Sequence, residues 1–287
     1  MPTINRTFLR LLFFSFSLKG YAQTDDLQTE NVLDELFSLD SLEVNEIFQS
    51  LKKDFLYFNI GFDEQAYFSG RDFGIEQYSF QPSVTYMKGS HLFFSLGSAY
   101  YSGLNPQWDL ISLSAGYFTS LDKQKKWSMS LLYGRMFFTD QTEQLNQNRL
   151  SASLNYRYKS LKLRAATGYL FGGAPSYYLS QSTTMDLVLV NEEKWSWRLS
   201  PALRFLWSQQ LFTEEVTSGR FGRFVTIVEQ EIFDLINIQL ELPINLDFGP
   251  WDVTLSHQFN FPKSLPNEQD VKNTSFFSFR LGYMLDF

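Results

Sequence analysis

Charged side chains recur at alternate positions along stretches that otherwise alternate between apolar and polar residues. The basic ones are Arg157, Lys162, Arg164, Arg198, Arg204 and Arg280, and the acidic ones are Asp63, Asp186, Glu241, Asp247 and Asp252. Side chains of one parity share one face of a strand, so we expect these groups on a common face. They could pair as a ladder of salt bridges, or they could line a passage and bias it toward anions. The residues alone leave both possibilities open.

The elements that position these charges are strands, because from Phe55 onward the sequence has a period of two. Leu150 to Lys159 alternates cleanly, and so does Ile236 to Phe248, where Ile236 belongs to the apolar face. In 177–190, Gln181 and Thr183 interrupt the apolar face, which predicts a bulge or an interface. About twelve strands are expected, near 55–68, 76–87, 91–102, 109–120, 127–138, 149–159, 161–172, 177–190, 195–208, 233–248, 251–262 and 274–287.

The last strand carries the most specific pattern. From Phe277 to Phe287 the odd positions are apolar or aromatic, whereas the even ones are small, polar or charged apart from Met284. This ending resembles the closing strand of bacterial outer-membrane β-barrels, whose terminal Phe is part of the assembly signal. The resemblance implies an all-β fold, a transmembrane antiparallel up-and-down barrel over 55–287. It also implies outer-membrane lipid and the barrel assembly machinery as partners, the latter through Phe287.

Composition agrees with this fold class. Aromatic residues make up 18% of the chain, yet its mean hydropathy is only −0.20. After the N-terminus no stretch reaches the roughly 18 consecutive apolar residues of a membrane helix. A barrel alternates lipid-facing and lumen-facing residues, so it looks soluble on average while remaining rich in aromatic residues. The chain has no cysteine and is acidic, which excludes thiol chemistry and argues against nucleic acid as a partner.

The N-terminus predicts export. Arg6 and Arg10 flank or enter an apolar run, and Gly20-Tyr21-Ala22 precedes Gln23, so residues 1–22 read as a signal peptide cleaved after Ala22. The Tyr-Ala-Gln ending resembles signal peptides common in Bacteroidota. A buried N-terminal strand or helix is the alternative. Cleavage removes three of the 24 basic residues, so the mature chain has 21 basic residues against 31 acidic ones. A signal peptide together with the resemblance to outer-membrane barrels predicts that the protein lies in the cell outer membrane.

Residues 23–54 differ from all that follows. Acidic residues dominate them, and apolar residues recur at helical spacing, which predicts two short amphipathic helices with Thr29 and Ser41 as N-caps. In a barrel this segment would start in the periplasm. It could stay as a solvated tail, fold back as a plug or dock on a periplasmic partner.

Short and long connections alternate along the chain, as expected when both termini lie in the periplasm. Trp127, Trp195 and Trp251 each follow a short turn and predict an aromatic girdle at that edge. The longest connection, 209–232, contains Arg220 and Arg223 and is too apolar for a freely solvated tip. It could extend the flanking strands with no gating role, or fold inward and make these arginines a constriction.

Catalytic signals are weak. His257 follows Ser256, and a His on the lipid side is similar to outer-membrane phospholipases, but those carry a Ser two residues after the His, where this chain has Phe259. His91 opens a strand beside a turn. No phosphate-binding loop, HExxH, zinc spacing or GxSxG occurs, so we expect no cofactor, no metal site and no catalytic residues.

Three functions follow as hypotheses. The first is a passive, porin-like channel for small solutes, supported by the polar inner face and by long loops. The second is a closed structural barrel or assembly partner, supported by the paired charges and the acidic helices. The third, and the weakest, is a barrel enzyme acting on lipids.

Overall fold

The structure is a computed structural model. It describes residues 54–67, 77–89, 91–105, 107–139, 147–173, 175–192, 194–218, 224–264 and 271–287, with the backbone alone for 211–218 and 224–230. The predicted signal peptide and the predicted helices of residues 23–54 lie outside the described residues, apart from Asp54. No helix in the described ranges is long and apolar enough to cross a membrane.

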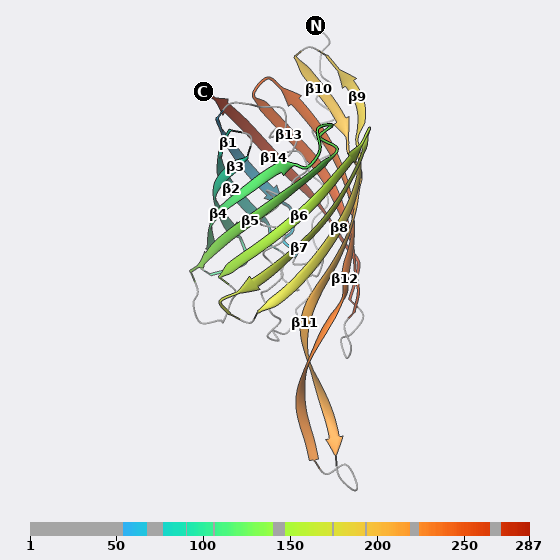
Figure 1. The fold of residues 1–287 in the computed structure, drawn as a ribbon. Coiled ribbons are helices and arrows are strands. Elements are labelled where there is room, and N and C mark those ends of the chain that lie inside the picture. The colour runs from blue at the N-terminus through green and yellow to red at the C-terminus, as the bar shows by residue number, and fades with distance from the viewer. Residues whose placement is uncertain are drawn as a thin grey trace, which may run out of the picture.

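Every element of the described part of the chain is a strand, as the period-two pattern requires (Figure 1). The strands are β1 (Phe55–Asp63), β2 (Ser79–Lys88), β3 (Leu92–Tyr101), β4 (Trp108–Ser120), β5 (Trp127–Phe138), β6 (Asn148–Tyr158), β7 (Leu161–Phe171), β8 (Ser176–Met185), β9 (Leu187–Asn191), β10 (Trp195–Leu199), β11 (Ala202–Ser218), β12 (Phe224–Phe248), β13 (Trp251–Pro262) and β14 (Thr274–Asp286).

These strands close into an antiparallel barrel of twelve staves. From β1 to β8 and from β12 to β14 each strand pairs with the next. β9 pairs with β10, β10 also pairs with β12, β1 pairs with β14, and β11 pairs with both β8 and β12, so the sheet closes on itself. Among the described residues, β8 and β9 form one stave interrupted at Asp186, and β10 and β11 form another interrupted at Ser200 and Pro201. The prediction of a twelve-stranded antiparallel barrel is therefore confirmed.

The two ends of the barrel differ. Tight turns join the strands at the end where β1 begins and β14 finishes, and we call it the short-turn end. Gly89 and Gly249 have φ of 60° in two of these turns, a left-handed conformation that glycine adopts without strain. Asp54 completes the first, because its carboxylate accepts bonds of 2.8 Å from the Gly89 N–H and the Tyr86 hydroxyl. The longer connections lie at the opposite end, the loop end.

The longest predicted connection is mostly strand. β11 and β12 stay paired as far as Ser218 opposite Phe224, and Figure 1 shows this hairpin continuing past the other strand ends, away from the barrel. Extension of the flanking strands is thus the alternative observed for 209–218 and 224–232. Arg220 and Arg223 lie outside the described residues, and their role as a constriction stays a prediction.

Register shifts occur in three pairings of the described strands: β9 with β10, β11 with β12 and β3 with β4. In the stave expected to be irregular, Leu189 has no cross-strand partner, because Val190 pairs with Trp197 and Val188 with Arg198. In β12, pairing with β11 jumps from Asn237 to Leu235 and leaves Ile236 as a bulge. The prediction that Ile236 lies on the outward apolar face is wrong: the bulge turns its side chain inside, where it is fully buried.

The outer face is apolar along the staves and aromatic at both ends. Exposed aliphatic and Phe side chains include Phe58, Ile60, Leu96, Leu113, Leu131, Leu154, Leu179, Leu203, Ile244, Leu255 and Phe279. At the short-turn end Trp127 stacks near Tyr156 and Trp251 near Tyr283, with ring centroids 4.5 and 4.6 Å apart. At the loop end a second aromatic group contains Tyr78, Tyr100 and Trp108. An apolar band between two aromatic girdles is typical of transmembrane barrels.

Candidate functional site

The inner face of the barrel is lined by small polar side chains at the positions that alternate with the outward apolar ones. Ser128, Ser130, Ser151, Ser153 and Ser278 are all buried. Hydroxyls meet across strands, as in the 2.7 Å bond between Ser130 and Ser153. These serines are short, so they leave the interior to the longer charged side chains that share their face.

The basic inner residues of β6 and β7 lie close together. Arg157 is directly opposite Lys162, and Arg164 is opposite Asn155. The ammonium group of Lys162 forms an ion pair with Asp186, the residue that interrupts the eighth stave. Lys162 is 4% exposed and Arg164 is 7% exposed, so both charges lie away from bulk water.

Arg149 belongs to the same wall but was not among the predicted site residues. Its guanidinium carbon lies 5.2 Å from the centroid of the Tyr178 ring, a cation–π contact, and both side chains are buried. The Tyr178 ring lies directly over Gly168. A Cβ added to Gly168 would stand 2.1 Å from a ring atom, so the absence of a side chain at Gly168 leaves room for the ring. Arg149 alternates with Ser151 and Ser153 along the strand, and this shared position on the inward face was the signal that could have identified it as a site residue.

The opposite part of the wall mixes both signs. Arg198 donates to Asp247 over 2.9 Å, and the Ser196 hydroxyl donates to the same carboxylate. Asp252 accepts a 2.9 Å bond from the Tyr57 hydroxyl, and Glu241 accepts one from Ser256.

Three further charges complete the mixed part. Asp63 accepts bonds of 3.0 Å from Ser79 and Gln81 and interacts electrostatically with Arg280. Arg204 donates to Gln239 over 3.4 Å. The eleven charged residues predicted to share one face thus lie at inward positions, although on different staves, and their function as the lining of a passage stays a prediction.

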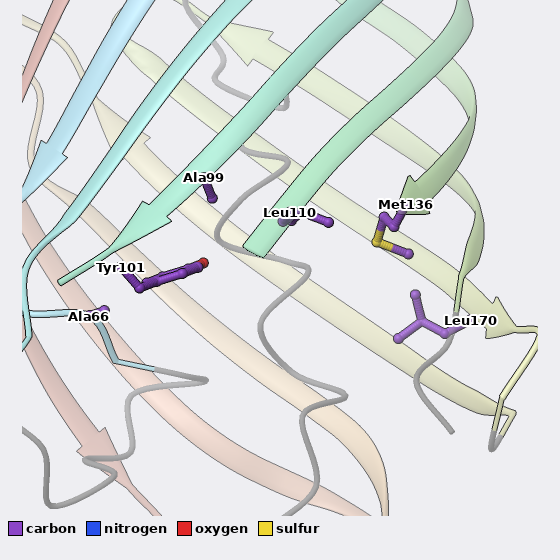
Figure 2. Close-up of a cluster of buried hydrophobic side chains, with 6 residues drawn as sticks. All are labelled: Ala66, Ala99, Tyr101, Leu110, Met136 and Leu170. Carbon is purple, nitrogen blue, oxygen red and sulfur yellow. The ribbon is translucent and has the colours of Figure 1, made fainter. Parts of the chain in front are cut away.

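Two apolar clusters lie inside the barrel, which sequence reasoning did not predict. The cluster at the short-turn end consists of Phe55, Tyr57, Met87, Phe93, Phe118 and Leu132. The cluster at the loop end consists of Ala66, Ala99, Tyr101, Leu110, Met136 and Leu170, and Figure 2 shows these side chains projecting into the space that the strands enclose. The inner face therefore carries an apolar cluster near each end of the barrel, beside the polar and charged side chains described above.

The histidines and the serine next to His257 do not form a catalytic pair. Ser256 is buried on the inner face, whereas the His257 ring stacks on Phe259 and Phe277 on the outer face, with centroids 4.3 Å away. Nucleophile and base would need to be within hydrogen-bond reach. His91 contacts the Phe118 carbonyl and the Tyr117 ring near a turn. Among the described residues no group of three metal-ligating side chains occurs.

No protein-family model matches the sequence, and no curated protein matches it. Similar solved structures include the KdgM porin, at 7% identity and a TM-score of 0.46, covering 81% of this chain and 99% of the porin. The translocator domain of the autotransporter NalP from Neisseria meningitidis has 13% identity and a TM-score of 0.45, covering 88% and 97%. LpxR from Salmonella typhimurium has 8% identity and a TM-score of 0.41, covering 80% and 99%.

Proposed function

We propose that the mature chain is an integral outer-membrane barrel that acts as a passive channel for small solutes. One observation carries this proposal: a closed barrel presents an apolar, aromatic-girdled outer face and a polar inner face with charged side chains. The outer face suits lipid, and an inner face of serines and charges suits hydrated solutes. The signal peptide of residues 1–22 would direct export, and its Tyr-Ala-Gln ending favours a Bacteroidota source.

The orientation follows from the two ends. Short turns are typical of the periplasmic side of outer-membrane barrels, and longer loops of the outside. The short-turn end would then hold residues 23–54 in the periplasm, where a partner could reach them. The projecting hairpin of β11 and β12 would extend outside the cell.

Recognition by the barrel assembly machinery is part of the same proposal. The C-terminal strand pairs with β1 along its length, and the Phe287 ring stacks on Tyr86 with centroids 6.4 Å apart. This terminal strand thus forms the closing seam of the barrel. A machinery that reads an aromatic C-terminus would act on it before the seam closes.

A closed structural barrel is the second candidate. The ion pairs of Lys162 with Asp186 and of Arg198 with Asp247 favour it, since paired charges fill space without carrying solute. The two apolar clusters inside the barrel favour it as well. A lipid enzyme has less support, because Ser256 and His257 face opposite sides of the wall.

Two experiments test this proposal in sequence. The mature chain should require detergent or lipid, and a monomer that stays soluble in buffer without either would contradict the membrane barrel. Purified protein in planar bilayers should then give stepwise ion conductance. A folded, inserted barrel that gives no conductance steps would favour the closed structural barrel instead.

A further inference from the structure

Strand β9 runs past its neighbour on one side at the short-turn end. β8, the first half of the same stave, stays paired with β7 as far as Met185 opposite Leu161, and the Asp186 N–H then donates to the Ser160 carbonyl over 2.8 Å. Beyond this point β9 pairs with β10 alone among the described strands. The edge of β9 that points away from β10 therefore lies past the β6–β7 turn with no described strand beside it. Figure 1 shows the β9–β10 hairpin at the end where β14 finishes.

Two apolar side chains of β9 are unusually exposed. Val188 is 60% exposed and Leu189 is 56% exposed, more than any other large apolar side chain of the described ranges apart from Phe287. Val188 lies opposite Arg198, whose guanidinium donates to Asp247 on the inner side of the wall. Cross-strand partners share a face, so Val188 lies on the inward side at the mouth of the barrel, where lipid does not cover it. An apolar, unpaired strand edge of this kind is a site for another segment of chain.

Residues 24–53 of this chain start at the same end of the barrel and are long enough to reach β9. The Gly89 N–H and the Tyr86 hydroxyl hold Asp54 at the short-turn end, so the residues before it leave the wall there. In the sheet order β9 is five steps from β1, almost across a mouth that is roughly 25 Å wide for twelve strands ~4.8 Å apart at a tilt of about 40°. Leu33 is 21 residues before Asp54, and at about 1.5 Å per residue even a fully helical connection would span about 30 Å.

The composition of this segment suits the exposed edge. The apolar stripe that lies far enough from Asp54 consists of Val32, Leu33, Leu36 and Phe37. The second stripe, within 44–51, starts ten residues before Asp54, and as a helix it would reach only about 15 Å, short of β9. The first stripe is therefore the one that can cover the apolar side chains of β9.

Charges on the rim complement those of the segment. Lys159 in the β6–β7 turn and Lys123 and Lys126 in the β4–β5 turn are exposed, on the side toward which the unpaired edge of β9 points. Residues 24–53 carry eight acidic residues against two lysines. The β9–β10 turn itself has Glu192 and Glu193 beside one lysine, so the attraction acts on the side of β4 to β7.

We propose that residues 24–53 fold back over the short-turn mouth and dock against β9. The stripe within 32–37 covers Val188 and Leu189, and the carboxylates of the segment face the lysines of the β4–β5 and β6–β7 turns. A second copy does not fit, because a two-fold axis perpendicular to the sheet relates two identical antiparallel edge strands and would invert one barrel in the membrane. The proposal rests on the fold and not on the proposed channel.

Disulfide formation tests the docked position. The chain has no cysteine, so two introduced thiols report on their own contact. In the full mature chain, folded in detergent and oxidised, Val188→Cys combined with Leu33→Cys or with Leu36→Cys should form a disulfide within one chain, which requires the two Cα atoms to come within about 7 Å. Leu150→Cys is the matched control in place of Val188→Cys, because Leu150 is 53% exposed on the outer face near the loop end. It should form no disulfide with either position.

A labelling rate gives a second, independent measurement. Val188→Cys alone should react slowly with a water-soluble maleimide, and adding Leu33→Asn and Leu36→Asn should raise its rate at least tenfold. The thiol of Lys272→Cys, at an exposed position of the loop end, should react equally fast in both backgrounds. The proposal is overturned if neither cysteine pair links, if the disulfide joins two chains, or if the asparagine substitutions leave the rate at Val188→Cys unchanged. None of these results depends on conductance, so the channel proposal is judged separately.

Discussion

The wall of β6 and β7 differs from the wall of β1 and β10 to β14 in how its charges are arranged. On the second wall Arg198 meets Asp247, and Asp63 lies near Arg280 and accepts bonds from two polar side chains. On the first, Arg149, Arg157, Lys162 and Arg164 are all basic, and Lys162 forms an ion pair with Asp186 of the neighbouring stave. The comparison teaches that one inner face can hold a region where charges of both signs pair beside a region where basic side chains gather.

Reversing a charge on the basic wall should have the largest effect. Arg164→Glu changes the local charge by two units, and one unit acts on an ion ~8 Å away with about 2 kcal/mol at an effective dielectric constant of about 20. We expect the ratio of chloride to potassium permeability to fall at least tenfold, measured as a reversal potential in a potassium chloride gradient. Arg204→Glu on β11 should change it less. Equal changes in both variants would remove the distinction between the walls.

Removing one carboxylate from each wall should lower the free energy of unfolding by different amounts. Asp186→Asn leaves the buried Lys162 without this counter-ion and should cost about 3 kcal/mol. Asp247→Asn affects a more exposed pair and should cost about 1 kcal/mol. Denaturant unfolding in detergent measures both. If Asp247→Asn proved the more destabilising change, the mixed wall would hold the more deeply buried charges, contrary to the structure.

The glycine under Tyr178 should tolerate substitution poorly. Gly168→Ala places a Cβ 2.1 Å from the ring, so Tyr178 and the Arg149 stacked on it must move, at about 1–3 kcal/mol. Gly134→Ala is the control, because its Cβ would meet no atom closer than 3.8 Å. Thermal unfolding should show a lower midpoint for Gly168→Ala only. Indistinguishable midpoints would mean that the ring adapts without strain.

The smallest effect concerns Asp54, just before β1. The Gly89 N–H and then the Tyr86 hydroxyl stabilise its carboxylate and hold its pKa below the ordinary 3.8. This stabilisation is present above pH 3.8 and is lost as the pH falls through the lowered pKa. Asp54→Asn should therefore be slightly less stable than the wild type at pH 7, with the difference shrinking in acid. A difference that grows in acid would contradict the lowered pKa.

Strand positions were predictable from the sequence because a barrel stave has one apolar and one polar face. The closing strand shows this best: Phe277 and Phe279 are exposed, and Ser278 between them is buried. Parity also identified most of the charges that face inward, although Arg149 was missed. It could not tell which of them pair, because pairing depends on the register between strands distant in sequence, as for Lys162 and Asp186.

Parity failed where both faces are apolar. Leu92, Phe93 and Phe94 are consecutive apolar residues, so nothing in their order shows that Phe93 turns inward. The register explains it, because Phe93 lies opposite Gly116, whose missing side chain makes room for the ring. The facing of Ile236 was predicted wrongly for a related reason. A single-residue bulge turns a side chain to the other face of the sheet without changing the local sequence pattern.

Under the proposed channel function, the reversal potential of the wild-type barrel tests the difference between the two walls most directly. A folded barrel in a planar bilayer, with a tenfold potassium chloride gradient across it, should show current reversing on the side of the chloride potential. That result is expected if the one-signed wall of β6 and β7 governs the passage while the mixed wall neutralises itself. A reversal on the potassium side would contradict it, and the acidic residues of the mixed wall would then be the ones that ions meet.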